Sequence, residues 1–426
     1  MALRHINTFD IDIDPETCPI DELKKLCVKL GDEENFWNSM QLATKRFINS
    51  IYGVFGSDYY NLANTNIAEA ITLQGQHLIK FSVKEIDDYF RDMWHLDFEG
   101  HKKIAEKMKS MYPDFDVDSF YEGAKIPLVF ESLQIYGDTD SAYVTLYPLV
   151  QNCKVKKNEE IDFCWTVHWA VMDEYLNEKF EAYAKSFHCL KNLEKFELEK
   201  ISRFVIMLSK KNYMCDVGWI DAPFHFAPLT HITYTGYDVV KSSTTDFCRN
   251  EMKIFTKFIF DKLNHDQMPT IGELVQKLRE AKRRFCMQSP NDAGKTVTVS
   301  DYDSFVCDDK SKDIKFFETG ENGKKLSVPI HVRAAAVYNH NILYKHREFL
   351  SKYELIKSGD KVRFYYTSSN GDVFGFVPDK FPVEFAPPMD VETQFEKSLL
   401  APLNRIIVAL GFNEVPPSLT YSVNLF

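Results

Sequence analysis

Apolar residues recur at three- and four-residue intervals over several long stretches of the chain, and this spacing predicts amphipathic helices. The first stretch covers residues 21–50, and the glycines of the following GVFGS, at positions 53 and 56, are expected to end that helix. A second helix is expected at residues 60–92. Further helical patterns lie at residues 162–188, at about 246–285, in HVRAAAVYNHNILY and in ETQFEKSLLAPLNRIIVALGF.

Three other stretches are rich in β-branched and aromatic residues, which is typical of strands. Residues 126–149, IPLVFESLQIYGDTDSAYVTLYPL, are expected to form two strands joined by a tight turn at GDTD. A second strand pair is expected in FELEKISRFVIMLSKKNYMC, with the polar SKKN at its bend, and a third in KVRFYYT and VFGFV. Strands and helices follow one another without a regular βαβ rhythm, so the pattern predicts an α+β fold.

The composition is that of a globular chain with roughly two to four domains. Of its 426 residues 45% are hydrophobic, but no apolar run is long enough to cross a membrane. The formal net charge of −11 argues against non-specific nucleic-acid binding, although basic strips such as KLREAKRRF leave local binding open. The N-terminal residues lack the apolar core of a secretory signal. The nine cysteines show neither a C-x-x-C pair nor zinc spacing, which favours a reduced, cytoplasmic environment.

Two carboxylates, Asp138 and Asp140, lie at the predicted hairpin tip between apolar strands. Such close carboxylates repel each other unless a cation lies between them, and their hard oxygen atoms suit Mg²⁺. Two such ions would together stabilise the attacking and leaving oxygens of a phosphoryl transfer. A bare D-x-D is more often an ordinary turn, in which Asp forms local hydrogen bonds. The surrounding Y-G and S, in a strand–turn–strand context, favour the metal site.

A second group of polar side chains lies on the first predicted helix. Lys45, Asn49 and Tyr52 are four and three residues apart, so one helical face presents a cation, an amide and an aromatic ring. This trio suits a nucleoside triphosphate, with the cation and amide on phosphate oxygens and the ring beside the base. Spacing alone would favour a surface lysine, a capping asparagine and a core tyrosine.

Four motifs together resemble those of family B DNA polymerases. IYGDTDSAYV resembles the palm motif, and in KRFINSIYG the K-x-x-x-N-S-x-Y-G pattern resembles the fingers motif. FELEKISRFVIMLSKKNY resembles the E-x-E-K…K-K-x-Y stretch, and TGYDVVKSSTT resembles the region where palm meets thumb. The motifs stand in the family's order, and the resemblance is nearest to T-even-type bacteriophage replicative polymerases.

The resemblance implies a role for each matched residue. Asp138 and Asp140 would bind the metals, Thr139 and Ser141 would shape the turn, Lys45 and Asn49 would bind the triphosphate, and Tyr52 would monitor the nascent base pair. Glu199 resembles an additional palm acid. The contacts to primer–template DNA would come from Ser141, Glu199, Lys210, Lys211, Tyr213, Lys241, Ser242 and Ser243. Asn212 replaces the family's usual arginine, which puts one DNA or phosphate contact in doubt, and Thr245 replaces the family's proline, so the fourth match is only moderate.

The family's third palm carboxylate, from a D-x-x-S-L-Y-P motif, is missing, and so are the carboxylates of the 3′–5′ exonuclease. The nearest stretch, TLYP at 145–148, follows the hairpin and has Ala142 where the acid would stand. We therefore expect a naturally split polymerase, in which a second chain supplies the third acid, the exonuclease and the remaining fingers, and shares two Mg²⁺ ions. The rival interpretation is a non-catalytic DNA- and clamp-binding subunit that keeps the polymerase architecture.

The same resemblance predicts a right-hand architecture with partial fingers helices, an antiparallel-sheet palm and a mostly helical thumb. Fingers are expected at residues 1–56, palm at 57–245, thumb at 246–410 and a tail at 411–426. The tail ends in SLTYSVNLF, where Leu425 and Phe426 would dock on a sliding clamp, though a frayed hydrophobic terminus is as good an interpretation. Expected partners are primer–template DNA and a dNTP, with no membrane, in the cytoplasm of an infected bacterium.

Overall fold

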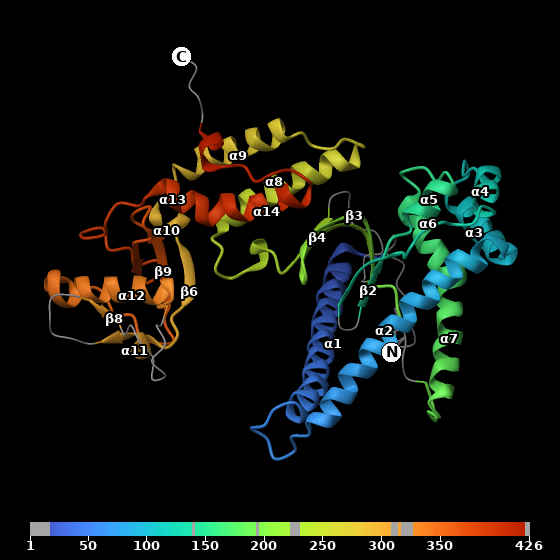
Figure 1. Ribbon diagram of the computed structural model, residues 1–426, viewed down its shortest axis with the longest axis horizontal. Coiled ribbons are helices and arrows are strands. Elements are labelled where there is room, and N and C mark those ends of the chain that lie inside the picture. Colours follow the sequence, from blue (N-terminus) through green and yellow to red (C-terminus); the bar gives the residue numbers. More distant parts are fainter. Residues whose placement is uncertain are drawn as a thin grey trace. The chain divides into compact units, whose positions relative to one another are not determined.

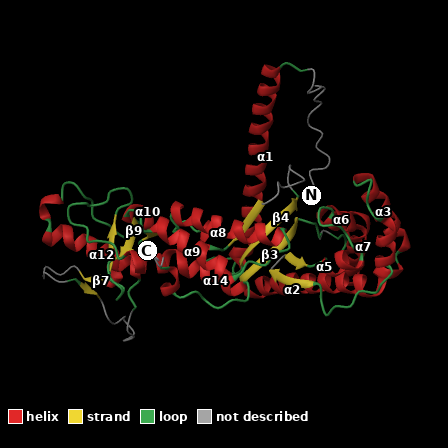
Figure 2. Ribbon diagram, turned by 90° about the horizontal axis from the view of Figure 1, so that it is seen from above, coloured by secondary structure: helices red, strands yellow, loops and turns green. Residues whose placement is uncertain are grey.

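The computed structural model describes residues 18–138, 141–192, 196–221, 231–307, 314–316 and 327–421 (Figure 1). The chain divides into two compact units, one made of Met1–Asp88 and Ser132–Thr145, the other of Tyr89–Glu131 and Leu146–Phe426. Figure 2 shows that helices predominate and that the sheets are small. Every strand pairing in the described residues is antiparallel. The predicted α+β class is therefore confirmed.

The first unit contains two long helices and a hairpin. Helix α1 (Ile20–Phe55) continues through Gly53 and ends before Gly56, whose backbone N–H donates to Tyr52 O. Helix α2 (Thr65–Asp88) follows, and strands β1 (Gln134–Asp138) and β2 (Ser141–Val144) form the hairpin. The buried carboxylate of Asp87 accepts hydrogen bonds from Leu133 N (2.8 Å) and Ser132 Oγ (2.7 Å). This acid ties the base of the hairpin to the end of α2.

The second unit begins with a group of short helices that precede its first sheet. They are α3 (Phe98–Met111), α4 (Val117–Ala124), α5 (Tyr147–Asn152), α6 (Glu160–Val167) and α7 (Asp173–Ser186). A single π-helical turn, His168–Met172, joins α6 to α7, so the helix predicted at 162–188 is confirmed with one interruption. Trp94, Phe120 and Phe163 are fully buried among these helices.

The sheet that follows has the order β3-β4-β5, with β3 at Lys200–Ser209, β4 at Asn212–Ile220 and β5 at His231–Thr235. The β3–β4 pair confirms the predicted strand pair. Helices α8 (Asp246–Asn264), α9 (Ile271–Phe285), α13 (Val391–Phe395) and α14 (Ala401–Ala409) share one apolar core with it. Met214 of the sheet and Phe255, Leu278 and Leu403 of the helices are buried in this core.

A second sheet has the order β10-β9-β6, from β6 (Lys295–Thr298), β9 (Lys361–Tyr366) and β10 (Val373–Phe376). The predicted third strand pair is thus confirmed. Helix α12 (Ile330–His340) packs on this sheet so closely that a Cβ on Gly375 would lie 2.8 Å from the Ala334 backbone. Other short elements include α10 (Pro290–Ala293), α11 (Tyr302–Phe305), β7 (Val306–Cys307) and β8 (Lys315–Phe316).

Two expectations need correction. The helical pattern at 246–285 forms two helices, α8 and α9, because Pro269 interrupts it and Thr270 begins α9 with a capping box to Glu273. The first strand of the hairpin also begins later than expected, at Gln134, and residues 126–133 are not a strand. Asp87 instead holds this approach to the hairpin through hydrogen bonds to Ser132 and Leu133.

Candidate active site and nucleic-acid interface

The hairpin places Asp138 at the last residue of β1, directly opposite Ser141, the first residue of β2. Ser141 Oγ donates to Asp138 O (3.3 Å), which closes the pair at the tip. Both residues are partly exposed. Thr139 and Asp140 lie outside the described residues, so their predicted roles remain predictions. The hairpin therefore places at least one carboxylate at the end of a strand.

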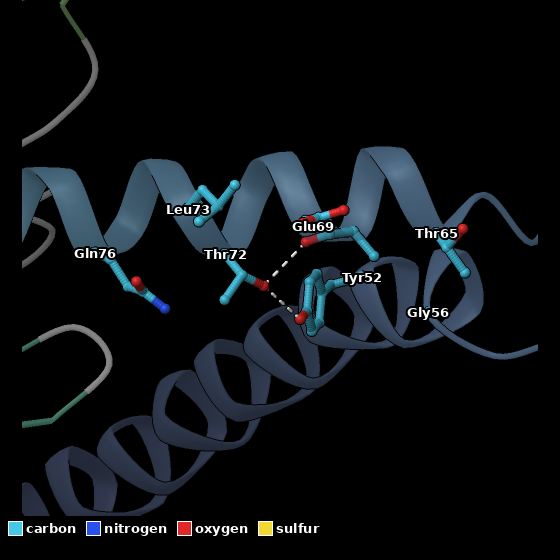
Figure 3. Close-up of a pocket in the computed structure, with 8 residues that line it drawn as sticks. Tyr52, Gly56, Thr65, Glu69, Thr72, Leu73 and Gln76 are labelled. Atoms are coloured by element: carbon cyan, nitrogen blue, oxygen red, sulfur yellow. Dashed lines mark hydrogen bonds between the residues drawn. The ribbon is translucent and has the colours of Figure 1, made fainter.

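Helix α1 presents the three residues expected to meet a nucleotide. Lys45, Asn49 and Tyr52 are all exposed, and they lie along one side of the helix, as the spacing predicts. The Tyr52 ring leans toward α2, where its hydroxyl lies 2.9 Å from Thr72 Oγ1 (Figure 3). Because Thr72 Oγ1 donates its own proton to Ala68 O (2.9 Å), it accepts the proton of Tyr52. Thr72 thus fixes the direction of the tyrosine ring.

A cavity of about 450 Å³ opens beside this hydrogen bond, between the end of α1 and the first half of α2 (Figure 3). Its walls are mixed polar and apolar and consist of Tyr52, Gly56, Thr65, Ala68, Glu69, Thr72, Leu73 and Gln76. Sequence reasoning missed Thr72. No short-range pattern links it to Tyr52, twenty residues earlier, and only the return of α2 along α1 brings the two hydroxyls together.

The second unit carries the basic turn between β3 and β4. Lys210 and Lys211 are exposed at this turn, and Lys211 has a left-handed backbone with φ of 58°. Glu199, just before β3, is also exposed. Tyr213, by contrast, is 9% exposed in β4, and the Lys200 ammonium lies 5.7 Å from its ring centroid. The predicted DNA contact of Tyr213 remains a prediction, and the packing gives the ring a structural role as well.

Gly236, in TGYDVV, lies against the turn between β3 and β4. It has a φ of 63°, and a Cβ added there would lie 2.0 Å from Lys211 O. Only glycine allows the end of β5 to approach the lysine turn so closely. The sheet therefore brings Lys211 and the segment leading to Lys241 toward each other.

Replacing Gly236 by alanine is expected to destabilise the second unit, because the new methyl group collides with backbone and the left-handed conformation disfavours it. Left-handed strain alone costs about 1–3 kcal/mol, and the collision adds to this. Chemical denaturation monitored by tryptophan fluorescence measures the loss. Gly272 to alanine is the matched control, because nothing lies within 4 Å of a Cβ there. Equal stability of the two variants would contradict the close approach at Gly236.

The segment that follows β5 is anchored by the carboxylate of Asp238. Lys241 Nζ lies 3.0 Å from Asp238 Oδ1, and the second oxygen of Asp238 pairs with Arg405 of α14. Ser242 is exposed and Ser243 is partly exposed. Thr245, which replaces the family's proline, is the N-cap of α8 and accepts a hydrogen bond from Cys248 N (3.3 Å). A threonine side chain can cap a helix in this way and a proline cannot, so the departure has a structural reason.

A comparison with family models shows to which family the chain belongs. The model for DNA polymerase family B matches residues 22–301, which is more than half of the chain. The chain belongs to DNA polymerase family B.

Two viral DNA polymerases are similar to this family B chain. One, a DNA polymerase of Choristoneura biennis entomopoxvirus, is 26% identical over 183 residues, or 43% of this chain and 17% of its own length. The other, a DNA polymerase catalytic subunit of Elephantid herpesvirus 1 (isolate Asian elephant/Berlin/Kiba/1998), is 25% identical over 245 residues, 57% of this chain and 18% of its own. The chain thus spans less than a fifth of the length of these curated relatives.

The residues predicted to form the site fall in both units. Asp138, Ser141 and the three α1 residues expected to meet a nucleotide belong to the first unit, whereas the lysine turn and Lys241 belong to the second. Leu425 and Phe426 lie outside the described residues. In the part of the chain that the structure describes, no three His, Cys, Asp or Glu side chains form a group that could hold a metal ion. No helix there is long and apolar enough to span a membrane.

Proposed function

We propose that this family B chain carries the part of a DNA polymerase that transfers a nucleotide from a dNTP to a primer 3′-hydroxyl on a DNA template. The observation that carries the proposal is Asp138 at the end of an antiparallel strand, opposite Ser141. In the sequence this strand leads directly to Asp140 through GDTD. The hairpin backbone would hold these carboxylates without depending on long side chains.

The face of α1 supplies the nucleotide contacts in this proposal. Lys45 would contact the triphosphate and protonate the leaving pyrophosphate, Asn49 would contact a phosphate oxygen, and Tyr52 would lie beside the nascent base pair. All three are exposed and therefore accessible to a ligand. On the other unit, Lys210, Lys211, Lys241, Ser242 and Ser243 would contact phosphates of the primer–template.

The donor set on the hairpin fits a hard divalent cation. A carboxylate at a strand end is the kind of ligand that Mg²⁺ uses together with waters and substrate phosphates. When bound by Asp138 and Asp140, two Mg²⁺ ions would neutralise charge that develops on the transferred phosphoryl group. The hairpin would position the carboxylates, and α1 would position the side chains that contact the triphosphate.

The third acid is proposed to come from a second polypeptide, which also carries the exonuclease and the remaining fingers. The motif D-x-x-S-L-Y-P does not occur in this sequence. Helix α1 supports the idea, because none of its side chains is buried although many are large and apolar. Such a surface is unusual for a helix that works alone in water.

The test is primer extension with this chain alone and with the polypeptide from the same genome that carries D-x-x-S-L-Y-P. Extension should require both polypeptides and should disappear when Asp140 is replaced by asparagine. Extension by the Asp140→Asn mixture at the unaltered rate would overturn the catalytic proposal. That result would favour the alternative, a non-catalytic DNA- and clamp-binding subunit. The presence of both hairpin acids and Lys45 supports the enzyme, since non-catalytic copies have no need of them.

Thr72 offers a finer test of the nucleotide face. Thr72→Val removes the acceptor of the Tyr52 hydroxyl while keeping the side-chain shape, so the ring should become free to rotate. A hydrogen bond of this kind contributes about 0.5–1.5 kcal/mol, so discrimination against mismatched dNTPs should fall by roughly two- to tenfold. Misincorporation kinetics measure the ratio, with Thr65→Val, another hydroxyl of the same cavity, as the control. Equal discrimination in both variants would contradict the role of Thr72.

Four narrower parts of the proposal rest on sequence resemblance. They are the likeness to T-even-type bacteriophage polymerases, the docking of Leu425 and Phe426 on a sliding clamp, work in the cytoplasm of an infected bacterium, and the fingers, palm and thumb limits at residues 56, 245 and 410. Deleting residues 422–426 and measuring processivity with and without a clamp would test the docking peptide.

A further inference from the structure

Residues 241–244 form a tight turn between the short helix Asp238–Val240 and helix α8. A hydrogen bond from Thr244 N to Lys241 O (3.1 Å) closes the turn, so Ser242 and Ser243 occupy its two central positions. Ser242 is exposed and Ser243 is partly exposed. The two serines therefore lie at the tip of the turn.

Three backbone carbonyls of this turn accept hydrogen bonds from other parts of the chain. Arg249, near the start of α8, donates from Nη2 to both Lys241 O (3.3 Å) and Thr244 O (3.1 Å). Thr296 N, in β6, donates to Ser243 O (3.4 Å). The protein thus uses the carbonyl acceptors of the turn, and Arg249 binds two of the three.

The same turn carries hydrogen-bond donors that the protein does not use. In the described part of the chain, neither the backbone N–H nor the hydroxyl of Ser242 or Ser243 has a hydrogen-bond partner. Lys241 adds an ammonium group, which lies 3.0 Å from Asp238 Oδ1. An ammonium, two hydroxyls and two amide N–H groups are all suited to the oxygen atoms of a phosphate. Carbonyl oxygens facing outward would instead repel such an anion.

Lys295, the first residue of β6, adds a further cation near the turn. Its ammonium donates to Lys397 O (2.9 Å). Burial lowers the pKa of Lys295, and the positive charges of Lys241 and Lys397 lower it further. Asp246 Oδ1 lies 3.4 Å from Arg249 Nη1, but the Asp246 side chain is 93% exposed, so water screens its charge. A phosphate bound at the turn would relieve the repulsion between the lysines.

We propose that Arg249 is a positioning residue for the contact of Lys241, Ser242 and Ser243 with the primer–template. By binding the carbonyls of residues 241 and 244, it keeps the donors of the turn available to one backbone phosphate. This role rests on the proposed function, which supplies the ligand. It adds a residue that lies beyond the motif TGYDVVKSSTT and acts through the turn without touching DNA.

Equilibrium binding of a primer–template duplex to the full chain tests this role. Arg249→Met keeps an apolar side chain of similar length but loses the donors. It should bind about tenfold more weakly, the loss expected for one charge-assisted hydrogen bond, and the slope of log Kd against log salt should fall by about one. Arg249→Lys should bind with intermediate affinity, because an ammonium can still donate to a carbonyl. Arg283→Met, which removes an exposed arginine from α9, is the matched control and should bind normally.

A double variant separates positioning from a direct contact with DNA. If Arg249 acts through the turn, Arg249→Met should cost little further affinity in a chain that already carries Lys241→Ala. If Arg249 itself contacts DNA, the two losses should multiply, and the positioning role is wrong. Circular dichroism checks that each variant is folded. Unaltered affinity in either folded variant of Arg249 would also overturn the role.

The possible outcomes separate this inference from the proposed function. Primer extension by the two-polypeptide mixture, together with normal DNA binding by the Arg249 variants, would overturn the positioning role and leave the polymerase proposal standing. A selective loss of DNA binding that does not multiply with Lys241→Ala, without any primer extension, would support the positioning role and count against the catalytic proposal. If the full chain binds no primer–template, the positioning role and the proposed DNA contacts of the turn are both wrong.

Discussion

Replacing Asp138 by asparagine is expected to slow primer extension by on the order of 10³-fold or more, because the metal-mediated charge stabilisation it removes is worth several kcal/mol. Asparagine has nearly the same shape as aspartate but lacks the negative charge. The hairpin should survive, since the Asp138–Ser141 pairing uses backbone atoms and the Ser141 hydroxyl. The measurement is single-turnover extension by the two-polypeptide mixture at saturating dNTP.

Asp118→Asn is the control for this change. Asp118 is an exposed acid in the first turn of α4, so the variant loses the same charge from a helix to which no nucleotide role is assigned. It should extend primers at the unaltered rate. Titration with Mg²⁺ adds a second readout, because a metal ligand changes the Mg²⁺ dependence and a purely structural residue does not. Normal extension and normal Mg²⁺ dependence in Asp138→Asn would remove Asp138 from the metal site.

Replacing Lys45 by alanine is expected to be the next most damaging change. The variant loses the cation that is proposed to meet the triphosphate and to protonate pyrophosphate, and general acid catalysis alone is worth about 10²–10⁴-fold in rate. Both the maximal rate and the apparent dNTP affinity should fall. Lys45→Arg should recover the affinity, because it keeps the positive charge, but recover the rate only in part, because a guanidinium rarely gives up a proton.

Arg46→Ala is the matched control for Lys45→Ala. Arg46 and Lys45 are adjacent exposed cations on α1, but successive residues on a helix point about 100° apart. Arg46→Ala should therefore leave both the rate and the dNTP affinity nearly unchanged. If the two alanine variants lose the same amount, the effect is a general loss of positive charge, and the specific role of Lys45 is wrong.

Much of the local structure follows from short-range pattern. The hairpin that carries Asp138 is predicted from alternating apolar residues around GDTD, because a tight turn forces the two strands beside it to pair. The helical period alone predicts that Lys45, Asn49 and Tyr52 lie on one side of α1. The lysine turn between β3 and β4 is likewise predicted from SKKN between two β-rich runs.

The spacing of apolar residues predicted the wrong element boundaries at two places, where a local signal overrides it. The helical pattern at 246–285 runs on through residues 265–270, where the structure has a loop. Pro269 keeps helical geometry from continuing there, and the capping box of Thr270 and Glu273 begins α9. The strand expected over residues 126–133 is absent, and at its end the Asp87 carboxylate accepts a hydrogen bond from the Leu133 backbone N–H. The proline and the T-x-x-E pattern can be read in the sequence, whereas the bond from Leu133 depends on the fold that brings Asp87 to it.

The sequence by itself determined the α+β class, the hairpin that carries Asp138 and the shared side of Lys45, Asn49 and Tyr52 on α1, since each depends on residues a few positions apart. The tertiary structure decided that Thr72 orients Tyr52 and that Gly236 lies against Lys211. These facts join segments twenty or more residues apart, and no short-range period encodes how a chain folds back on itself.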